Sequence, residues 1–162
     1  VCLVPQHRQE LTTEGGLLVR ADDRALRTTI EALRAAGIVV SLFIEPDPDT
    51  VRLARTVGAD AVELHTGTWA NAWLDRRGED RDGAIAAQLQ RLQRAAEAAA
   101  EVGIRLHAGH GITYRNVGDL LGLPGLRELN IGHCIVSRAV LVGMERAVRE
   151  MKVLMVPGGP SN

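Results

Sequence analysis

The chain has 162 residues, a length typical of one domain with one core, and we expect a single domain over residues 1–162. Its 19 lysine and arginine residues nearly balance its 20 acidic residues, which argues against nucleic acid or an anionic membrane as a partner. No apolar run approaches the roughly 18 residues that a membrane span needs. Cys2 and Cys134 both lie in apolar stretches, as free buried thiols do, so we expect a reducing, cytoplasmic setting.

Short runs rich in β-branched residues alternate with amphipathic patterns along the chain. The runs predict five buried strands, at residues 1–5, 38–44, 61–66, 104–109 and 128–136. Helices are predicted around residues 26–33, after the start signal Asp47-Pro48, over 83–102 and over 136–151. The polar stretch 74–82 is expected to be a solvated loop or the start of a helix. Gly37, Gly58 and Gly103 each stand just before a strand and are expected to close the preceding helix in a left-handed conformation.

This alternation predicts an α/β fold with a parallel sheet covered by helices. An open doubly wound sheet and a (β/α)8 TIM barrel both fit, but no Gly-x-Gly-x-x-Gly follows the first strand, so the barrel is favoured. Five strands cannot close such a barrel. We therefore expect the chain to supply strands 4 to 8, with three βα units missing ahead of Val1.

Polar side chains are concentrated where the predicted strands end. The strand period of two places Glu63 and His65 on one face, with Val62 and Leu64 on the other. If the apolar face meets the helices, the Glu63 carboxylate points into the barrel, where it needs a partner or a raised pKa. A buried structural ion pair or hydrogen bond would explain the same pattern.

Two imidazoles mark the end of the fourth predicted strand. His107 and His110 are three residues apart and would face opposite ways on a regular strand, which argues against a two-histidine metal clamp. Gly109 and Gly111 would let the backbone swing His110 into the barrel mouth, where histidine is a natural proton carrier. A loop histidine bonded to a neighbouring carbonyl is the alternative.

Two further segments suggest anion binding. Gly132-His133 stands before a helix, where free backbone N–H groups can hold a phosphate after the last strands of a barrel. The polar segment 8–16, which includes Thr12, follows the first strand. It is either an ordinary connecting loop or a source of hydroxyl and N–H groups for a phosphate or a sugar.

Taken together, the motifs resemble those of the pyridoxine 5′-phosphate synthase family. They are Val4-Pro5, Arg8-Gln9-Glu10, Thr12-Thr13-Glu14-Gly15-Gly16, Val40-Ser41-Leu42-Phe43-Ile44, Glu63-Leu64-His65-Thr66-Gly67, Ala108-Gly109-His110-Gly111, Thr113-Tyr114, Asn116-Val117, Glu128-Leu129-Asn130-Ile131-Gly132-His133 and Ser137-Arg138-Ala139. The resemblance implies a (β/α)8 barrel and a homo-octamer. It implies condensation of 1-deoxy-D-xylulose 5-phosphate with 3-amino-1-hydroxyacetone 1-phosphate to pyridoxine 5′-phosphate, phosphate and water, with no metal or organic cofactor.

The resemblance also implies roles for individual residues. His110 would be the general acid and Glu63 the group that stabilises the transition state. Thr12 would contact the deoxyxylulose phosphate, and the amino-ketone phosphate would rest in a cradle made of Gly111, Gly132 and His133. The imine forms between the two substrates and not with a lysine of the enzyme. This suits a chain that has a single lysine, Lys152.

The similarity covers the C-terminal two thirds of the family pattern, from its fourth strand onward. Three features of the family have no counterpart here, namely a basic histidine, phosphate-binding arginines and a second glutamate. This chain alone is therefore not expected to convert the substrates. His107 stands where asparagine is usual, and we expect it to alter hydrogen bonding beside His110. Trp69 stands where tyrosine is common.

Two other functions are compatible with the sequence. A metal-dependent hydrolase would need His65, His107, His110 or His133 to converge with carboxylates. A non-catalytic phosphate-binding barrel or an inactive fragment would bind phosphate without depending on His110.

Overall fold

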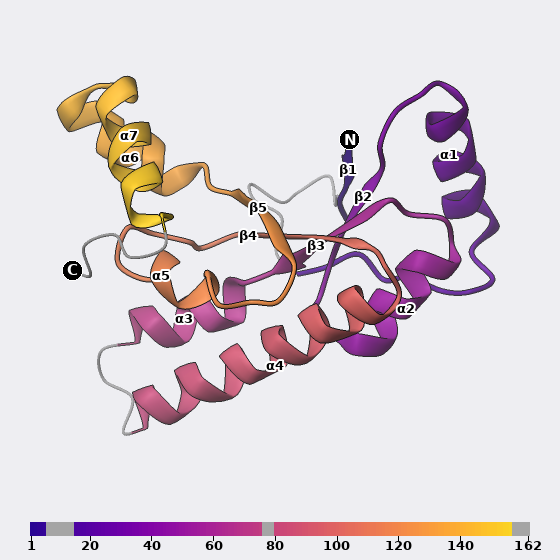
Figure 1. The fold of residues 1–162 in the computed structure, drawn as a ribbon, viewed down its shortest axis with the longest axis horizontal. Helices are drawn as coiled ribbons and strands as arrows, with labels where there is room; N and C mark the ends of the chain where they lie inside the picture. The colour runs from indigo at the N-terminus through magenta and orange to yellow at the C-terminus, as the bar shows by residue number, and fades with distance from the viewer. Residues whose placement is uncertain (6–14, 76–79, 157–162) are drawn as a thin grey trace.

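The computed structural model describes residues 1–5, 15–75 and 80–156 (Figure 1). Its strands are β1 (Cys2–Leu3), β2 (Ser41–Ile44), β3 (Ala61–His65), β4 (Arg105–Gly109) and β5 (Leu126–Asn130). All neighbouring strands run parallel, and their order in the sheet is their order in the chain. The predicted α/β fold with a five-stranded parallel sheet is therefore confirmed.

The helices are α1 (Arg24–Ala35), α2 (Pro48–Thr56), α3 (Gly67–Leu74), α4 (Arg81–Glu101), α5 (Val117–Leu120), α6 (His133–Val142) and α7 (Met144–Leu154). Helices α1 to α5 lie between successive strands, whereas α6 and α7 follow the last strand and pack against each other (Figure 1). The long helix α4 packs against α2 and α3, and both α2 and α4 contact β3. Because parallel strands need crossover connections, this helical layer follows directly from the strand order.

Local sequence signals account for several of the helix ends. Asp47 caps α2, because its carboxylate accepts a hydrogen bond of 2.8 Å from the Thr50 backbone N–H, and Pro48 occupies the first turn. Gly37, Gly58 and Gly103 have φ angles of 74°, 99° and 65°. The predicted closure of three helices on left-handed glycines is therefore confirmed.

The core lies between the sheet and the helical layer. Every residue of β2 and β3 is buried, and Val62 and Leu64 belong to one apolar cluster with Leu92 of α4. Glu63 and His65, which alternate with them, therefore point to the opposite face of the sheet. The helices cover the apolar face, as predicted, and the polar side chains of β3 are on the other face.

Three sequence predictions need correction. The strand predicted at 128–136 ends at Asn130, because residues 133–136 already form the first turn of α6. The helix predicted at 136–151 is two helices, separated at Gly143, whose φ of 83° breaks the helical backbone. The predicted helices did not include α3 or α5. The helix start expected within the polar stretch 74–82 is confirmed, because α4 begins at Arg81 and Asp80 caps it by accepting from the Gly83 N–H at 3.1 Å.

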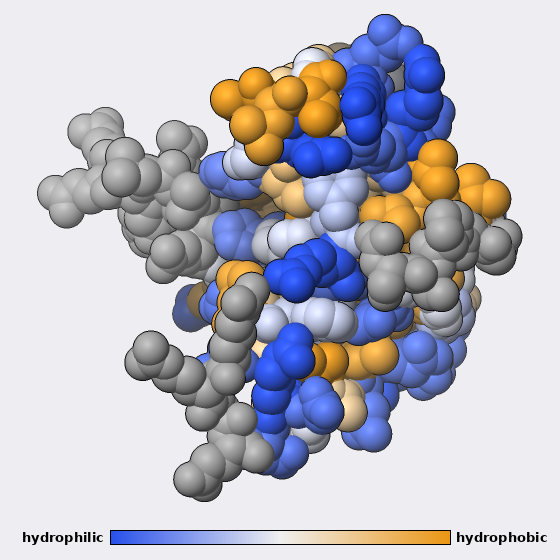
Figure 2. Space-filling view, turned by 90° about the vertical axis from the view of Figure 1, so that its left-hand side faces the viewer, coloured by the Kyte–Doolittle hydropathy of each residue, from blue (hydrophilic) through white to orange (hydrophobic). Residues whose placement is uncertain are grey.

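Two surface properties complete the description. In the described ranges, no helix combines the length and the apolar character that crossing a bilayer requires. Figure 2 shows apolar side chains gathered at the top of the molecule, where α6 and α7 lie. Those that are exposed on these helices are Val136, Val140, Leu141, Met144, Val148 and Val153.

Candidate active site

The carboxyl ends of β4 and β5 meet at one pocket of about 390 Å³. Four of the residues singled out in the sequence line it, namely His110, Gly111, Gly132 and His133. Its other lining residues are Leu74, Ile112, Thr113, Asn130, Ile131, Cys134 and Ser137. The structure therefore brings together side chains that are more than 20 positions apart. Thr12 lies outside the described residues.

Glu63 is buried beside this pocket, with 8% of its surface exposed. Its Oε2 accepts a hydrogen bond of 2.7 Å from Asn130 Nδ2, and the Cys2 thiol donates to the same oxygen at 3.5 Å. Burial raises the pKa of Glu63, while these hydrogen bonds oppose the rise. Burial, and then the nearby carboxylate, raises the pKa of the Cys2 thiol to about 11, so that it remains a donor. The inward glutamate thus has both partners and a raised pKa.

The raised pKa of Glu63 predicts a pH-dependent stability. The folded protein binds the carboxyl proton more tightly than the unfolded chain does. The protonated carboxyl therefore adds to the free energy of unfolding. This contribution is fully present below about pH 4, near the ordinary glutamate pKa, and is lost as pH rises through the pKa of Glu63 in the folded protein. Relative to a Glu63→Gln variant, the parent should therefore lose unfolding free energy across this window, as measured by urea unfolding at several pH values. Glu31→Gln, on the exposed face of α1, is the control, and parallel curves for parent and Glu63→Gln would contradict the prediction.

His110 follows the last residue of β4 in a left-handed conformation, with φ of 82°. The Thr66 hydroxyl donates to its carbonyl oxygen at 2.5 Å and to that of Gly109 at 2.8 Å, which fixes the turn. Its ring lies edge-to-face against His65, with centroids 4.9 Å apart. The alternation expected on a regular strand therefore does not extend from His107 to His110, and the imidazole swings toward the β3 side chains.

The site also contains a carboxylate that the sequence analysis did not single out. Glu45 directly follows β2, and its Oε1 lies 2.7 Å from His65 Nδ1 and accepts from the Gly16 N–H at 3.0 Å. A polar residue directly after a buried strand was the available signal. It was missed because the neighbouring Asp47 and Pro48 already explained the polar character of this turn as a helix start.

The phosphate cradle inferred from the resemblance is built around two glycines. Gly132 is the N-cap of α6 and His133 is its first residue, and no side chain caps this end. The first residues of α6 line the pocket, and no side chain occupies their N–H groups, as at anion-binding helix ends. Gly111 has φ of 76°, and a Cβ at this position would collide with the Cβ of Ala70 in α3. Only glycine fits this close approach.

The two departures from the family pattern lie in different places. His107 pairs in register with Glu63. Burial raises the Glu63 pKa, and His107 is one of the neighbours that oppose this rise. It is therefore placed to act on Glu63 as well as beside His110. Trp69 is buried in the core, with 1% of its surface exposed, and its indole N–H has no hydrogen-bond partner among the described residues.

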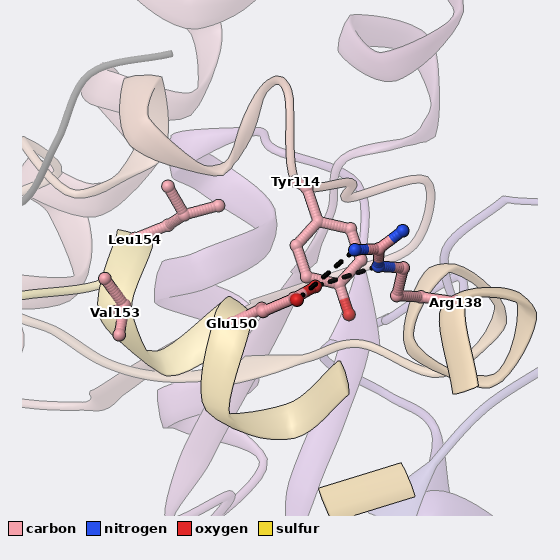
Figure 3. A pocket seen from close by; sticks show the side chains of 5 residues that line it. All are labelled: Tyr114, Arg138, Glu150, Val153 and Leu154. Carbon is pink, nitrogen blue, oxygen red and sulfur yellow. Dashed lines mark hydrogen bonds and ion pairs between the residues drawn. The ribbon is translucent and has the colours of Figure 1, made fainter. Parts of the chain in front are cut away.

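A second pocket, of about 450 Å³, contains none of the predicted site residues (Figure 3). Its charged lining side chains are Arg138 and Glu150, which are joined by hydrogen bonds of 2.8 and 3.2 Å. Arg146 also binds Glu150, at 2.8 Å, and these arginines lower the pKa of Glu150 to about 2. The Tyr114 hydroxyl donates to the Ala147 carbonyl at 2.8 Å. These groups bind one another and tie α6, α7 and the loop after β4 together.

The metal-dependent alternative needs histidines and carboxylates that converge. In the described part of the chain, no group of three or more His, Cys, Asp or Glu side chains is arranged to hold a metal ion. His65 is instead paired with Glu45 through Nδ1 and stacked edge-on against His110.

The fold and the pocket define an α/β protein with a polar site at the carboxyl ends of its parallel strands. A family model, "Pyridoxal phosphate biosynthesis protein PdxJ", matches residues 1–157, and the chain belongs to this family.

Curated relatives agree with this assignment. A pyridoxine 5′-phosphate synthase of Synechococcus sp. (strain JA-2-3B'a(2-13)) is 49% identical over 155 residues, which are 96% of this chain and 62% of the relative. The synthase of Opitutus terrae is 48% identical over 157 residues, with 97% and 61% covered. The chain thus spans about three fifths of the length of these relatives. Among solved structures, the Amycolatopsis orientalis BexX/CysO complex matches with a TM-score of 0.44 and 22% sequence identity. The match covers 87% of this chain and 53% of the chain in that structure, and no argument rests on it.

Proposed function

We propose that the protein containing this chain is a pyridoxine 5′-phosphate synthase. It would condense 1-deoxy-D-xylulose 5-phosphate with 3-amino-1-hydroxyacetone 1-phosphate, giving pyridoxine 5′-phosphate, phosphate and water. The observation that carries the proposal is the single pocket that His110, Gly111, Gly132 and His133 line in a chain of this family. The relatives at 46–49% identity are named for this activity.

In this mechanism His110 is the general acid. It gives a proton to the oxygen that leaves as water or phosphate while the imine between the two substrates closes into the ring. Glu63 lies beside the pocket and stabilises positive charge that develops in the transition state. Gly111 and the N-terminus of α6 at Gly132-His133 hold the phosphate of the amino ketone. Thr12 is proposed to contact the deoxyxylulose phosphate.

We further propose that the chain is the C-terminal part of a (β/α)8 TIM barrel, from the fourth strand onward, and forms one domain over residues 1–162. Five parallel strands in chain order, with helices on one face and polar side chains on the other, support this architecture. The chain matches 62% and 61% of the length of the first two relatives, which supports a match to five of eight βα units.

The partners proposed are the two phosphorylated substrates, without nucleic acid, membrane, metal or organic cofactor, and further copies of the chain in a homo-octamer. The exposed apolar side chains on α6 and α7 support burial against other protein surfaces (Figure 2). Cys2 and Cys134 are both free thiols, which is consistent with the cytoplasmic setting that we propose.

The test is an assay of the reading frame extended upstream of Val1. Mass spectrometry would follow pyridoxine 5′-phosphate formation from the two phosphorylated substrates. We expect product from the extended protein. A folded extended protein that makes no product would refute the proposed function.

A further inference from the structure

One pair of side chains near the pocket has no role in the proposed mechanism. Glu45 follows β2 and His65 ends β3, and their Oε1 and Nδ1 atoms are 2.7 Å apart. An ionised carboxylate can only accept a hydrogen bond, so the hydrogen of the pair belongs on His65 Nδ1. In the neutral imidazole the other ring nitrogen, Nε2, is then an acceptor.

The His65 ring is held from several sides. Phe43 lies edge-on to it at 5.2 Å between centroids, and His110 lies edge-on at 4.9 Å. A Cβ on Gly67 would collide with His65 Nε2 and would lie 3.1 Å from His110 Cδ2. Glycine at position 67 is therefore what lets Nε2 and the His110 ring approach the same point at the start of α3.

His65 is nine-tenths buried, with 9% of its surface exposed, yet its Nε2 has no hydrogen-bond partner among the described residues. A histidine with a purely structural role would normally have both ring nitrogens satisfied, because a buried unpaired polar atom is costly. The unpaired atom points to the His110 side of the ring, where the proposed proton transfer takes place.

We propose that Glu45 and His65 form a positioning dyad for His110. This inference rests on the proposed function, in which His110 is the general acid. Glu45 fixes the tautomer and the plane of the His65 ring, and the ring in turn sets the orientation of the His110 imidazole. His65 Nε2 is buried at the start of α3 and remains an acceptor for the neighbouring His110 imidazole. His65 thus acts through His110 without being the proton donor itself.

Orientation of this kind affects turnover more than binding. A proton donor must lie along the path to the leaving oxygen, and misplacement by about 1 Å can cost about 100-fold in rate. The phosphate contacts at Gly132 and His133 come from a different strand end and do not involve the dyad. Loss of the dyad should therefore lower kcat and leave KM for both substrates nearly unchanged.

The kinetic test compares Glu45→Ala, Glu45→Gln, His65→Ala and the double variant in the extended protein. We expect Glu45→Ala and His65→Ala each to lower kcat about 10- to 100-fold with KM within about twofold of the parent. The double variant should lose no more than the worse single variant, because the two residues act as a unit. Glu45→Gln keeps an acceptor for Nδ1–H and should recover part of the loss. The matched control is Glu101→Gln, the same change at an exposed pair with Arg52.

A second measurement does not depend on activity. Solid-state NMR of the ¹⁵N-histidine-labelled extended protein reads the tautomer of His65, assigned by comparison with His65→Gln. We expect hydrogen on Nδ1 alone in the parent, and loss of this preference in Glu45→Ala. Hydrogen on Nε2 of His65 in the parent would overturn the inference.

Together the two measurements separate the possible failures. An inactive parent with the expected tautomer would refute the synthase assignment while the dyad itself stands. An active parent whose Glu45 and His65 variants keep the parental kcat, or raise KM instead, would overturn the positioning role while the synthase assignment stands.

Discussion

Substitution of His110 by asparagine in the extended protein is expected to lower kcat/KM for pyridoxine 5′-phosphate formation by about 100-fold or more, the scale of general acid catalysis. Asparagine removes the proton donor with little strain, because His110 has φ of 82°, a conformation that asparagine adopts more readily than alanine. The loss of activity can therefore be separated from a loss of stability. His110→Ala should show the same loss in activity together with lower stability. Steady-state kinetics on both variants, with thermal unfolding of each, checks this.

Chemical rescue provides the control for this prediction. Imidazole added to His110→Ala should restore part of the lost rate, since it can occupy the space of the missing side chain and donate a proton. The affinity of each variant for inorganic phosphate should match that of the parent, because His133 and Gly132 remain in place. Parental activity in His110→Asn would show that another group is the proton donor and would favour a phosphate-binding role for the pocket.

Gly16→Ala is expected to lower the unfolding free energy by about 3 kcal/mol, at the upper end of the range for overpacking. A Cβ at this position would lie 2.5 Å from the carbonyl carbon of Ile44 and closer still to the backbone nitrogen of Glu45. The backbone cannot move aside as a side chain could, because the Leu17 N–H donates to the Phe43 carbonyl at 2.7 Å in the same place.

Urea unfolding of the extended protein, followed by circular dichroism, measures this loss. Gly118→Ala is the matched control, since a Cβ there meets no atom within 4 Å and alanine favours its helix, α5. An unfolding midpoint for Gly16→Ala equal to that of the parent would contradict the prediction. Activity should fall as well, because the Gly16 N–H donates to the carboxylate of Glu45.

The fold could be predicted where local chemistry and burial agree. The first four strands followed from runs rich in β-branched residues, and Asp47 marked a helix start through its own side chain. The fifth strand was predicted too late in the chain, because β5 itself contains no β-branched residue. Helix α3 could not be predicted in the same way, because it begins at Gly67 directly after β3 and no side chain caps it. The break at Gly143 was equally hidden, since the apolar pattern continues through it and only the backbone angle shows the interruption.

The site could be predicted only where a residue type implied its chemistry. Histidines beside glycines at two strand ends suggested the pocket that His110 and His133 line. Asn130 was quoted as part of a motif without a role. Its bond to Glu63 joins residues 67 positions apart, on the two strands β3 and β5 that flank β4. Glu45 is an ordinary loop carboxylate until the sheet places it against His65. Sequence spacing cannot show such contacts, because they form between strands and not within them.

The agreement between strand order and chain order also bears on how such a site can change during evolution. Each of the three residues proposed to act in the site lies on its own βα unit: Glu63 on β3, His110 directly after β4 and His133 in the segment after β5. The left-handed glycines before β3 and β4, Gly58 and Gly103, mark points where a unit ends without interrupting a helix or a strand. Recombination between relatives at these points would exchange the segment that carries Glu63 separately from the segment that carries His110 and His133, and would leave the order of the strands in the sheet intact.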